Sequence, residues 1–159
     1  MLFLFDLDGT MIDSSHRQNT LADGSLDLAH WIENNTPEKI MADTLLPLAN
    51  EWKAIDRNRH SIVIMTARII GDADIQFLRE NGLGYDYIYS RKEGDNSPDD
   101  ILKRRFLFFL ARRMKWSIAK LRAHAYMFDD NKKVRDMMQS ESIRAFDPEP
   151  INNFSLREL

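Results

Sequence analysis

Residues 1–10 read MLFLFDLDGT. The apolar run Leu2 to Phe5 leads directly into two aspartates, Asp6 and Asp8, and then a glycine. The run predicts a strand that is buried on both faces, because such a strand lacks the polar alternation of a half-exposed one. Carboxylates at i and i+2 at a strand end point to the same side, and Gly9 permits a tight turn. The alternative is an ordinary turn, in which Asp and Gly are common.

Four further runs of apolar, β-branched or aromatic residues also predict buried strands. They are Ser61 to Met65, Asp86 to Tyr89, Ala125 to Phe128 and Ser142 to Phe146. Between the strands lie helical patterns: Leu26 to Asn34, Pro37 to Asp56, Asp72 to Asn81, Pro98 to Lys115, Ile118 to Ala123 and Lys132 to Gln139. Strands that alternate with helices predict an α/β fold with a Rossmann-like, parallel, five-stranded sheet and helices on both faces.

Length and composition are typical of one globular domain, residues 1–159: the net charge is −3, 43% of residues are hydrophobic and 30% are charged. The lack of cysteine excludes disulfide scaffolds, thiolate metal sites and cysteine nucleophiles. The first apolar run is too short for a signal peptide or a membrane span, so we expect a cytoplasmic protein without a membrane partner. Two prolines and low hydrophobicity predict a loosely held segment over residues 147–159.

A second pair of acids, Asp129 and Asp130, follows the strand predicted for residues 125–128. The carboxyl ends of parallel strands meet at one edge of a sheet, so these acids are expected beside Asp6 and Asp8. Two carboxylates about 5 Å apart repel by roughly 3 kcal/mol at an effective dielectric near 20. A divalent cation relieves this repulsion, and a ligand set of oxygens alone favours Mg²⁺ over zinc.

Two residues at the end of the second strand, Thr66 and Arg68, suit a phosphate group. The hydroxyl donates a hydrogen bond, and the guanidinium forms a bidentate, charge-assisted pair. The alternatives are a threonine that caps a helix and an arginine that is a solvated surface charge.

Lys103 lies on the predicted buried side of its helix. A projection at 100° per residue places it among Phe106, Leu107, Leu110 and Met114. A lysine on a buried face is costly unless its ammonium reaches a charged partner or water. The carboxylates and a phosphate supply such a partner; the alternative is a lysine that snorkels to the surface.

The opposite side of the same helix is basic. It gathers Arg104, Arg105, Arg112 and Lys115 around Phe108, and no acidic residue occurs over residues 101–128. A basic face with an interleaved aromatic residue is typical of a surface that follows a nucleic-acid backbone. A merely solvated charged face remains the alternative.

In their order along the chain, these residues resemble the haloacid dehalogenase (HAD) superfamily of phosphohydrolases. The resemblance is carried by Asp6-x-Asp8-Gly9-Thr10, Thr66, Lys103 and Asp129-Asp130. Within it, the chain is most similar to the 3′-phosphatase domains of phage polynucleotide kinases, through Arg17, Thr66-Ala67-Arg68 and the segment Arg91 to Lys103. Two departures stand out: no kinase P-loop motif occurs, and residues 21–40 have no counterpart, which leaves the substrate open.

The resemblance implies a Mg²⁺-dependent phosphatase that works through an aspartyl phosphate. Asp6 would attack phosphorus, and Asp8 would protonate the leaving alkoxide and then take a proton from water. The implied metal ligands are Asp6, the main-chain carbonyl of Asp8, Asp129, and Asp130 as a ligand or a support. The implied phosphate and substrate contacts are Thr66, Lys103, Arg17 and Arg68, with Asp99 orienting Lys103.

The segment from about Ser14 to Thr36 is predicted to form a small cap. Trp31 in this segment either stacks on a base or belongs to an apolar helix stripe with Leu28 and Ile32. A small cap admits a nucleic-acid end as well as a mononucleotide. The resemblance to phage 3′-phosphatase domains implies removal of 3′-phosphates from nucleic-acid ends, in the host cytoplasm if the protein is of phage origin. The alternatives are a nucleotidase for free mononucleotides and a catalytically inactive HAD fold that binds a partner.

Overall fold

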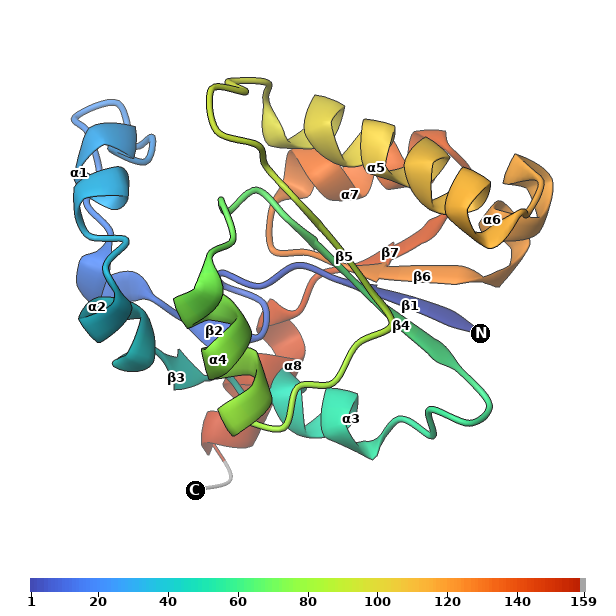
Figure 1. Cartoon of the computed structure of the whole chain (residues 1–159), viewed down its shortest axis with the longest axis horizontal. Helices are drawn as coiled ribbons and strands as arrows, with labels where there is room; N and C mark the ends of the chain where they lie inside the picture. The colour runs from blue at the N-terminus through green and yellow to red at the C-terminus, as the bar shows by residue number, and fades with distance from the viewer. Residues whose placement is uncertain (158–159) are drawn as a thin grey trace.

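The computed structural model describes residues 1–157, and the side chains of residues 1–154. Its centre is a sheet of five parallel strands in the order β5-β4-β1-β6-β7 (Figure 1). The strands are β1 Leu2–Phe5, β4 Ser61–Thr66, β5 Tyr87–Ser90, β6 Ala125–Phe128 and β7 Arg144–Phe146. The predicted α/β fold with five parallel strands is confirmed.

Helices cover both faces of this sheet. One face packs against α5 Asp99–Met114, α6 Ile118–His124 and α7 Lys132–Ser140. The other packs against α3 Leu48–Ala54 and α4 Asp72–Glu80. Successive strand residues alternate between the two cores: Leu4 belongs to the first and Phe5 to the second. Two-sided burial is the reason why the strands are continuous apolar runs.

The helix predicted over Pro37 to Asp56 is wrong. The structure has α2 Pro37–Met41, strand β3 Thr44–Leu45 and then α3. Pro47 explains the break, because proline has no N–H for a helical hydrogen bond and keeps the preceding residue out of helical geometry. β3 pairs antiparallel with β2 Ile12–Asp13, which brings the segment before β3 close to the end of β1.

Most of the segment that was predicted to be loosely held, residues 147–159, is helical. Residues Glu149–Arg157 form α8. The buried Asn152 amide donates to the Thr10 carbonyl (3.1 Å), and its oxygen accepts from the Leu48 N–H (2.8 Å). Two satisfied hydrogen bonds in a buried position hold this helix against the loop after β1. Glu158 and Leu159 lie outside the described residues.

Residues 14–36, hereafter the insert, lie beyond the carboxyl ends of the strands (Figure 1). They contain a 3-10 helix, Ser15–Arg17, and α1, Leu28–Glu33. Across the described residues, every helix is too short or too polar to cross a membrane.

Candidate active site

Three carboxylates converge where β1 and β6 end. Phe5 and Phe128 are register partners, so Asp6 and Asp129 leave neighbouring strands side by side. One oxygen from each of Asp6, Asp129 and Asp130 lies within 4.8 Å of the others. The sequence predicted that these acids meet, and the structure brings them together.

Lys103 reaches this group from α5. Its Nζ donates to Asp6 Oδ1 (2.9 Å) and to Asp129 Oδ2 (2.6 Å), and only 1% of the residue is exposed. Burial opposes its charge, but the carboxylates of Asp129 and Asp6 outweigh burial and raise the pKa of Lys103. The prediction of a buried lysine with a charged partner agrees with this geometry. We call Asp6, Lys103, Asp129 and Asp130 the acid–lysine cluster.

The acid–lysine cluster carries more negative than positive charge. Burial and the charge of Asp6 raise the pKa of Asp129 to about 7. Asp130 is an exposed residue, and partial burial of its carboxyl together with the charges of Asp6 and Asp129 raises its pKa to about 8. The raised pKa values reflect three carboxylates that share one ammonium in a small volume. The donor set consists of oxygens, as Mg²⁺ prefers, so these residues fit a divalent cation.

The turn after β1 depends on Gly9. Its φ is +74°, and a Cβ built at this position would collide with the Asp130 carboxylate. The next residue, Thr10, is buried; its hydroxyl donates to Asp6 Oδ2 (3.2 Å) and accepts from the Asp130 N–H (3.2 Å). The motif therefore links the ends of β1 and β6 through Thr10.

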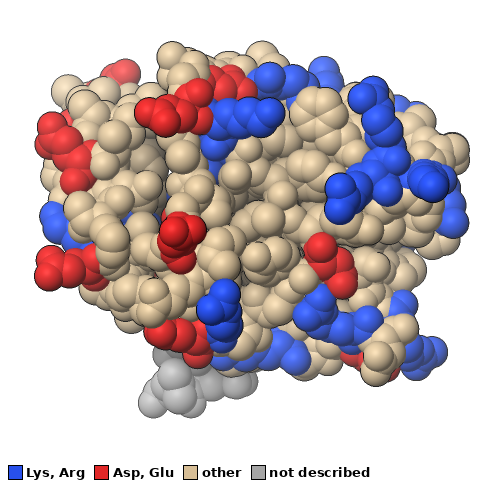
Figure 2. Space-filling model, viewed as in Figure 1, with Lys and Arg blue, Asp and Glu red and all other residues tan. Residues whose placement is uncertain are grey.

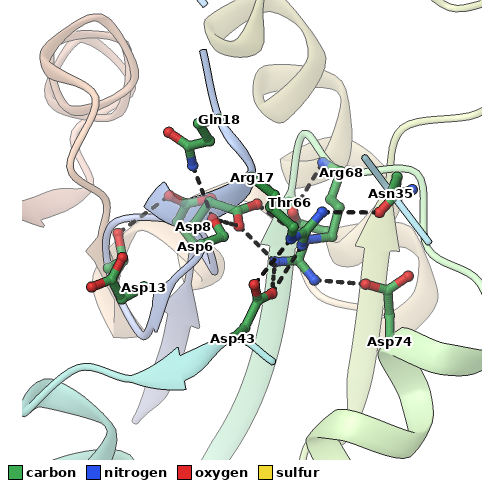
Figure 3. Close-up of polar contacts among 12 residues, drawn as sticks. Asp6, Asp8, Asp13, Arg17, Gln18, Asn35, Asp43, Thr66, Arg68 and Asp74 are labelled. Atoms are coloured by element: carbon green, nitrogen blue, oxygen red, sulfur yellow. Dashed lines mark hydrogen bonds and ion pairs between the residues drawn. The ribbon is translucent and has the colours of Figure 1, made fainter. Parts of the chain in front are cut away.

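The Asp8 carboxylate pairs with Arg68 (Figure 3) and is not among the three acids whose oxygens lie within 4.8 Å of one another. Arg68 Nη2 donates to Asp8 Oδ1 (2.6 Å) and Nε to Asp8 Oδ2 (3.1 Å), while Ser14 Oγ donates to Oδ1 (2.6 Å). Burial raises the pKa of the Asp8 carboxyl, but Arg68 more than offsets it, so the pKa is lowered overall. Of the four acids expected at this edge of the sheet, Asp8 thus has a guanidinium partner of its own, whereas Asp6 and Asp129 share Lys103.

The two predicted substrate arginines are buried and paired with acids. Arg17 is 1% exposed, and its Nε and Nη2 donate to Asp43 Oδ1 (3.0 Å) and Oδ2 (2.9 Å). Arg68 is 2% exposed; besides Asp8 it donates to Asp74 Oδ1 (2.6 Å) and Asp43 Oδ2 (3.3 Å). We call Asp8, Arg17, Asp43, Arg68 and Asp74 the arginine cluster. Figure 3 shows the two guanidiniums between these acids.

Sequence reasoning missed Asp43 and Asp74. Asp43 fell inside the wrongly predicted helix, and Asp74 is in the first turn of α4, where an acid is common for dipole reasons. Pro47 was the available signal, because a proline interrupts a helix. It indicated that the helix predicted over Pro37 to Asp56 is broken, so that the residues before Pro47 can form a loop and a strand.

Thr66 ends β4, the strand that pairs with β1 on the side opposite β6. It is 1% exposed, and its Oγ1 accepts from the Arg68 N–H (3.0 Å). The hydroxyl proton therefore remains available to a phosphate. This contact also sets the backbone of the loop that carries Arg68.

Asp99 does not orient Lys103 as predicted. It accepts from Arg91 Nη2 (3.0 Å) instead. Lys103 turns towards the core, whereas the Asp99 side chain is 39% exposed at the start of α5. Arg91 also donates to the carbonyl of Ala67 (2.9 Å), and so ties the start of α5 to the loop after β4.

Trp31 in α1 stacks on an arginine. The Cζ of Arg17 lies 4.3 Å from its ring centroid. The predicted apolar stripe is not buried, because Leu28 and Ile32 are 63% and 64% exposed.

Comparison with known proteins shows a similarity in sequence to one family and a similarity in fold to several solved structures. The family model described as Bacteriophage T5 5′-deoxynucleotidase matches residues 1–156. The 5′-deoxynucleotidase of Escherichia phage T5 is 27% identical over 172 aligned residues, which cover 96% of this chain and 68% of that protein.

Solved structures share the fold. A HAD-superfamily hydrolase from Geobacter sulfurreducens superposes with a TM-score of 0.63 and 13% identity, over 91% of this chain and 86% of that one. A chain of the Pnkp1/Rnl/Hen1 RNA repair complex gives a TM-score of 0.60 and 21% identity over 92% of this chain; the match spans only 41% of that chain. The solved structures show that the chain has the fold of HAD-superfamily hydrolases, and the family match shows that it belongs to the family of Bacteriophage T5 5′-deoxynucleotidase.

Proposed function

We propose that this protein is a Mg²⁺-dependent phosphatase that removes the 5′-phosphate of deoxyribonucleoside monophosphates through an aspartyl phosphate. The observation that carries the proposal is the position of Asp6, a carboxylate held between Lys103 and the acids at the end of β6. The family match over residues 1–156 supports a free mononucleotide as the substrate. Of the two substrates expected from the sequence, we therefore favour the free mononucleotide over the nucleic-acid end.

The acid–lysine cluster would hold the metal ion. Its ligands would be the carboxylates of Asp6, Asp129 and Asp130 and the main-chain carbonyl of Asp8. When bound, Mg²⁺ neutralises phosphoryl oxygens that would otherwise repel an anionic nucleophile. Lys103 contributes a second positive charge at the same place, and Thr66 offers its hydroxyl proton to the phosphate.

Asp6 is the proposed nucleophile. Hydrogen bonds from Thr10 and Lys103 fix its two oxygens. Asp8 is ionised in its pair with Arg68, so it first takes the proton of the substrate's phosphate monoanion. One oxygen of Asp6 then attacks phosphorus, the bond from phosphorus to the sugar oxygen breaks, and the alkoxide leaves with that proton from Asp8. Water then attacks the aspartyl phosphate and gives a proton to Asp8, which restores Asp6 and releases inorganic phosphate.

The insert is the proposed cap. It lies beyond the strand ends and places Trp31 beside the arginine cluster. On the strength of the phage relative, we propose the cytoplasm of an infected host cell as the place of action.

The test is phosphate release, with and without Mg²⁺, from deoxyribonucleoside 5′-monophosphates, 3′-monophosphates and a 3′-phosphorylated oligonucleotide at matched concentrations. We expect rapid, Mg²⁺-dependent release from the 5′-monophosphates, with Asp6→Asn as the blank. Preference for the oligonucleotide would overturn the substrate, and release that is equal in the blank would overturn the mechanism.

A second candidate substrate, a nucleic-acid 3′-phosphate end, is favoured by the basic surface over α5 and α6 (Figure 2). Phe108 and Phe109 there are 45% and 48% exposed. Arg104 and Arg122 pair with Glu141, and Arg105 pairs with Asp95. The cations for which the described residues provide no carboxylate partner are Arg112, Arg113, Lys115 and Lys120.

Salt separates the two candidates. A protein whose Lys and Arg side chains neutralise Z phosphates of a single strand binds that strand with an affinity whose log–log salt slope is about −0.7Z. If the basic surface binds substrate, oligonucleotide hydrolysis falls steeply with salt, whereas mononucleotide hydrolysis does not. Equal salt dependence would leave the surface as solvated charge.

A further inference from the structure

The carboxylate of Asp43 connects the insert to the core. It is 6% exposed, and it lies between α2 and β3. Both of its oxygens are used: Oδ1 accepts from Arg17 Nε (3.0 Å) and contacts His16 Nε2 (2.7 Å), and Oδ2 accepts from Arg17 Nη2 (2.9 Å) and Arg68 Nη2 (3.3 Å). One acid thus contacts two fully buried guanidiniums from segments far apart in the chain.

On one side, Asp43 fixes the insert through Arg17. Arg17 Nη1 donates to Asn35 Oδ1 (3.2 Å), and the face of Trp31 covers the guanidinium. The beginning and the end of the insert therefore meet on one arginine, and Asp43 holds that arginine in a bidentate pair. Such pairs restrict orientation as well as distance.

On the other side, Asp43 fixes Arg68, which holds Asp8. The Nε and Nη2 of Arg68 contact both oxygens of Asp8, and Nη1 is held by Asp74. Nη2 is shared between Asp8 and Asp43. The position of the Asp8 carboxylate therefore depends on Arg68, and that of Arg68 depends on Asp43 and Asp74.

We propose that Asp43 is a positioning residue of the phosphatase reaction, which couples the insert to the group that protonates the leaving alkoxide. The inference rests on the proposed function, since it requires Asp8 to act as the general acid. Replacement of Asp43 by asparagine removes the carboxylate that, among the described residues, forms ion pairs with both guanidiniums. Arg68 then shifts and carries Asp8 with it, and a misplacement of about 1 Å at a reacting group costs up to about 100-fold in rate.

The test uses leaving groups that differ in their need for a proton. A sugar alkoxide must be protonated as it leaves, whereas p-nitrophenolate leaves without a proton. For Asp43→Asn we expect kcat to fall about 100-fold on a deoxyribonucleoside 5′-monophosphate and on glycerol phosphate. On p-nitrophenyl phosphate we expect the first turnover, read as the initial release of p-nitrophenolate, to slow by less than about threefold, because on this ester only the later hydrolysis of the aspartyl phosphate needs Asp8. KM should change little on the two alkyl esters.

Two further variants separate positioning from folding. Asp136→Asn removes an exposed partner of Lys132 on α7 and should leave the hydrolysis rates of all three esters unchanged. If Asp43→Asn alone does not fold, Asp43→Asn combined with Arg17→Met removes one charge of each sign from the cluster. This double variant should show the same selective loss on alkyl esters, because Arg68 has still lost Asp43.

The possible outcomes separate a failure of this inference from a failure of the proposed function. Equal slowing of the first turnover on the alkyl and nitrophenyl esters, in a variant that melts as a folded protein, would overturn the inference and leave the proposed function standing. A rise in KM with unchanged kcat would also overturn it, because it would make Asp43 a binding group. Wild-type protein that hydrolyses none of the three esters would overturn the proposed function and the inference together.

Discussion

The acid–lysine cluster and the arginine cluster lie side by side at the carboxyl ends of the strands, but their charges are arranged differently. In the first, three carboxylates face one ammonium, and the pKa values of Asp129 and Asp130 are raised. In the second, two guanidiniums face three carboxylates, and the pKa of Asp8 is lowered. The first cluster is incomplete without a cation, whereas the second is satisfied by the chain itself. We infer that the first cluster supplies the nucleophile and holds the metal ion, and that the second positions the general acid, Asp8.

The largest expected effect is on the nucleophile. Asp6→Asn preserves the shape of the side chain but removes the attacking carboxylate, so phosphate release should fall by about 10⁴-fold or more. Steady-state release from a deoxyribonucleoside 5′-monophosphate measures it. A loss of less than tenfold would assign the attack to another group.

Next in size is a stability effect in the arginine cluster. Asp74→Asn leaves Arg68 with one carboxylate fewer and weakens the cap on the Gly71 N–H, so it should destabilise the fold by about 3–5 kcal/mol. Urea unfolding measures the change. Asp136→Asn, in an exposed pair, should change stability by less than about 1 kcal/mol. Similar values for the two variants would show that the arginine cluster is not a structural unit.

A smaller effect is expected at Gly9. Gly9→Ala and Gly24→Ala both place a side chain at positive φ, at +74° and +88°, which costs about 1 kcal/mol. At Gly24 nothing lies within 4 Å of the new Cβ, whereas at Gly9 it collides with Asp130. Gly9→Ala should therefore destabilise more than Gly24→Ala and weaken Mg²⁺ binding as well. Equal losses in the two variants would mean that Asp130 moves aside freely.

The acid–lysine cluster should respond to pH in the opposite sense to ordinary paired acids. Asp129 and Asp130 have raised pKa values in the fold, so between pH 4 and 8 the native state binds more protons than the unfolded state. Metal-free stability should therefore fall as the pH rises through this window, and Asp130→Asn should raise the metal-free melting temperature. Mg²⁺ should stabilise more at pH 8 than at pH 6, because it no longer competes with protons. Melting curves that show no difference between these pH values would contradict the site.

Much of the fold and of the acid–lysine cluster was predictable from the sequence. Leu2 to Phe5 and the other runs indicated strands because two-sided burial makes them uniformly apolar. The apolar surroundings of Lys103 placed its side chain in the interior. Asp6 and Asp129 were expected to meet because parallel strands end at one edge.

The arginine cluster was not predictable in the same way. Its acids come from residues that only the fold brings together: Asp43 is 26 positions from Arg17 and 25 from Arg68. The β2–β3 pairing that places Asp43 has two residues in each strand, too few for a periodic pattern. Arginine is usually exposed, so the burial of Arg17 and Arg68 follows only once their partners are known.

The most direct test of the central claim is to trap the phosphorylated enzyme. Protein with Mg²⁺ and a deoxyribonucleoside 5′-monophosphate would be quenched in acid during turnover, and its peptides examined by mass spectrometry. The account predicts a phosphoryl group on the peptide that contains Asp6, absent from Asp6→Asn. Turnover with the phosphoryl group on another residue, or with none on the protein, would contradict it.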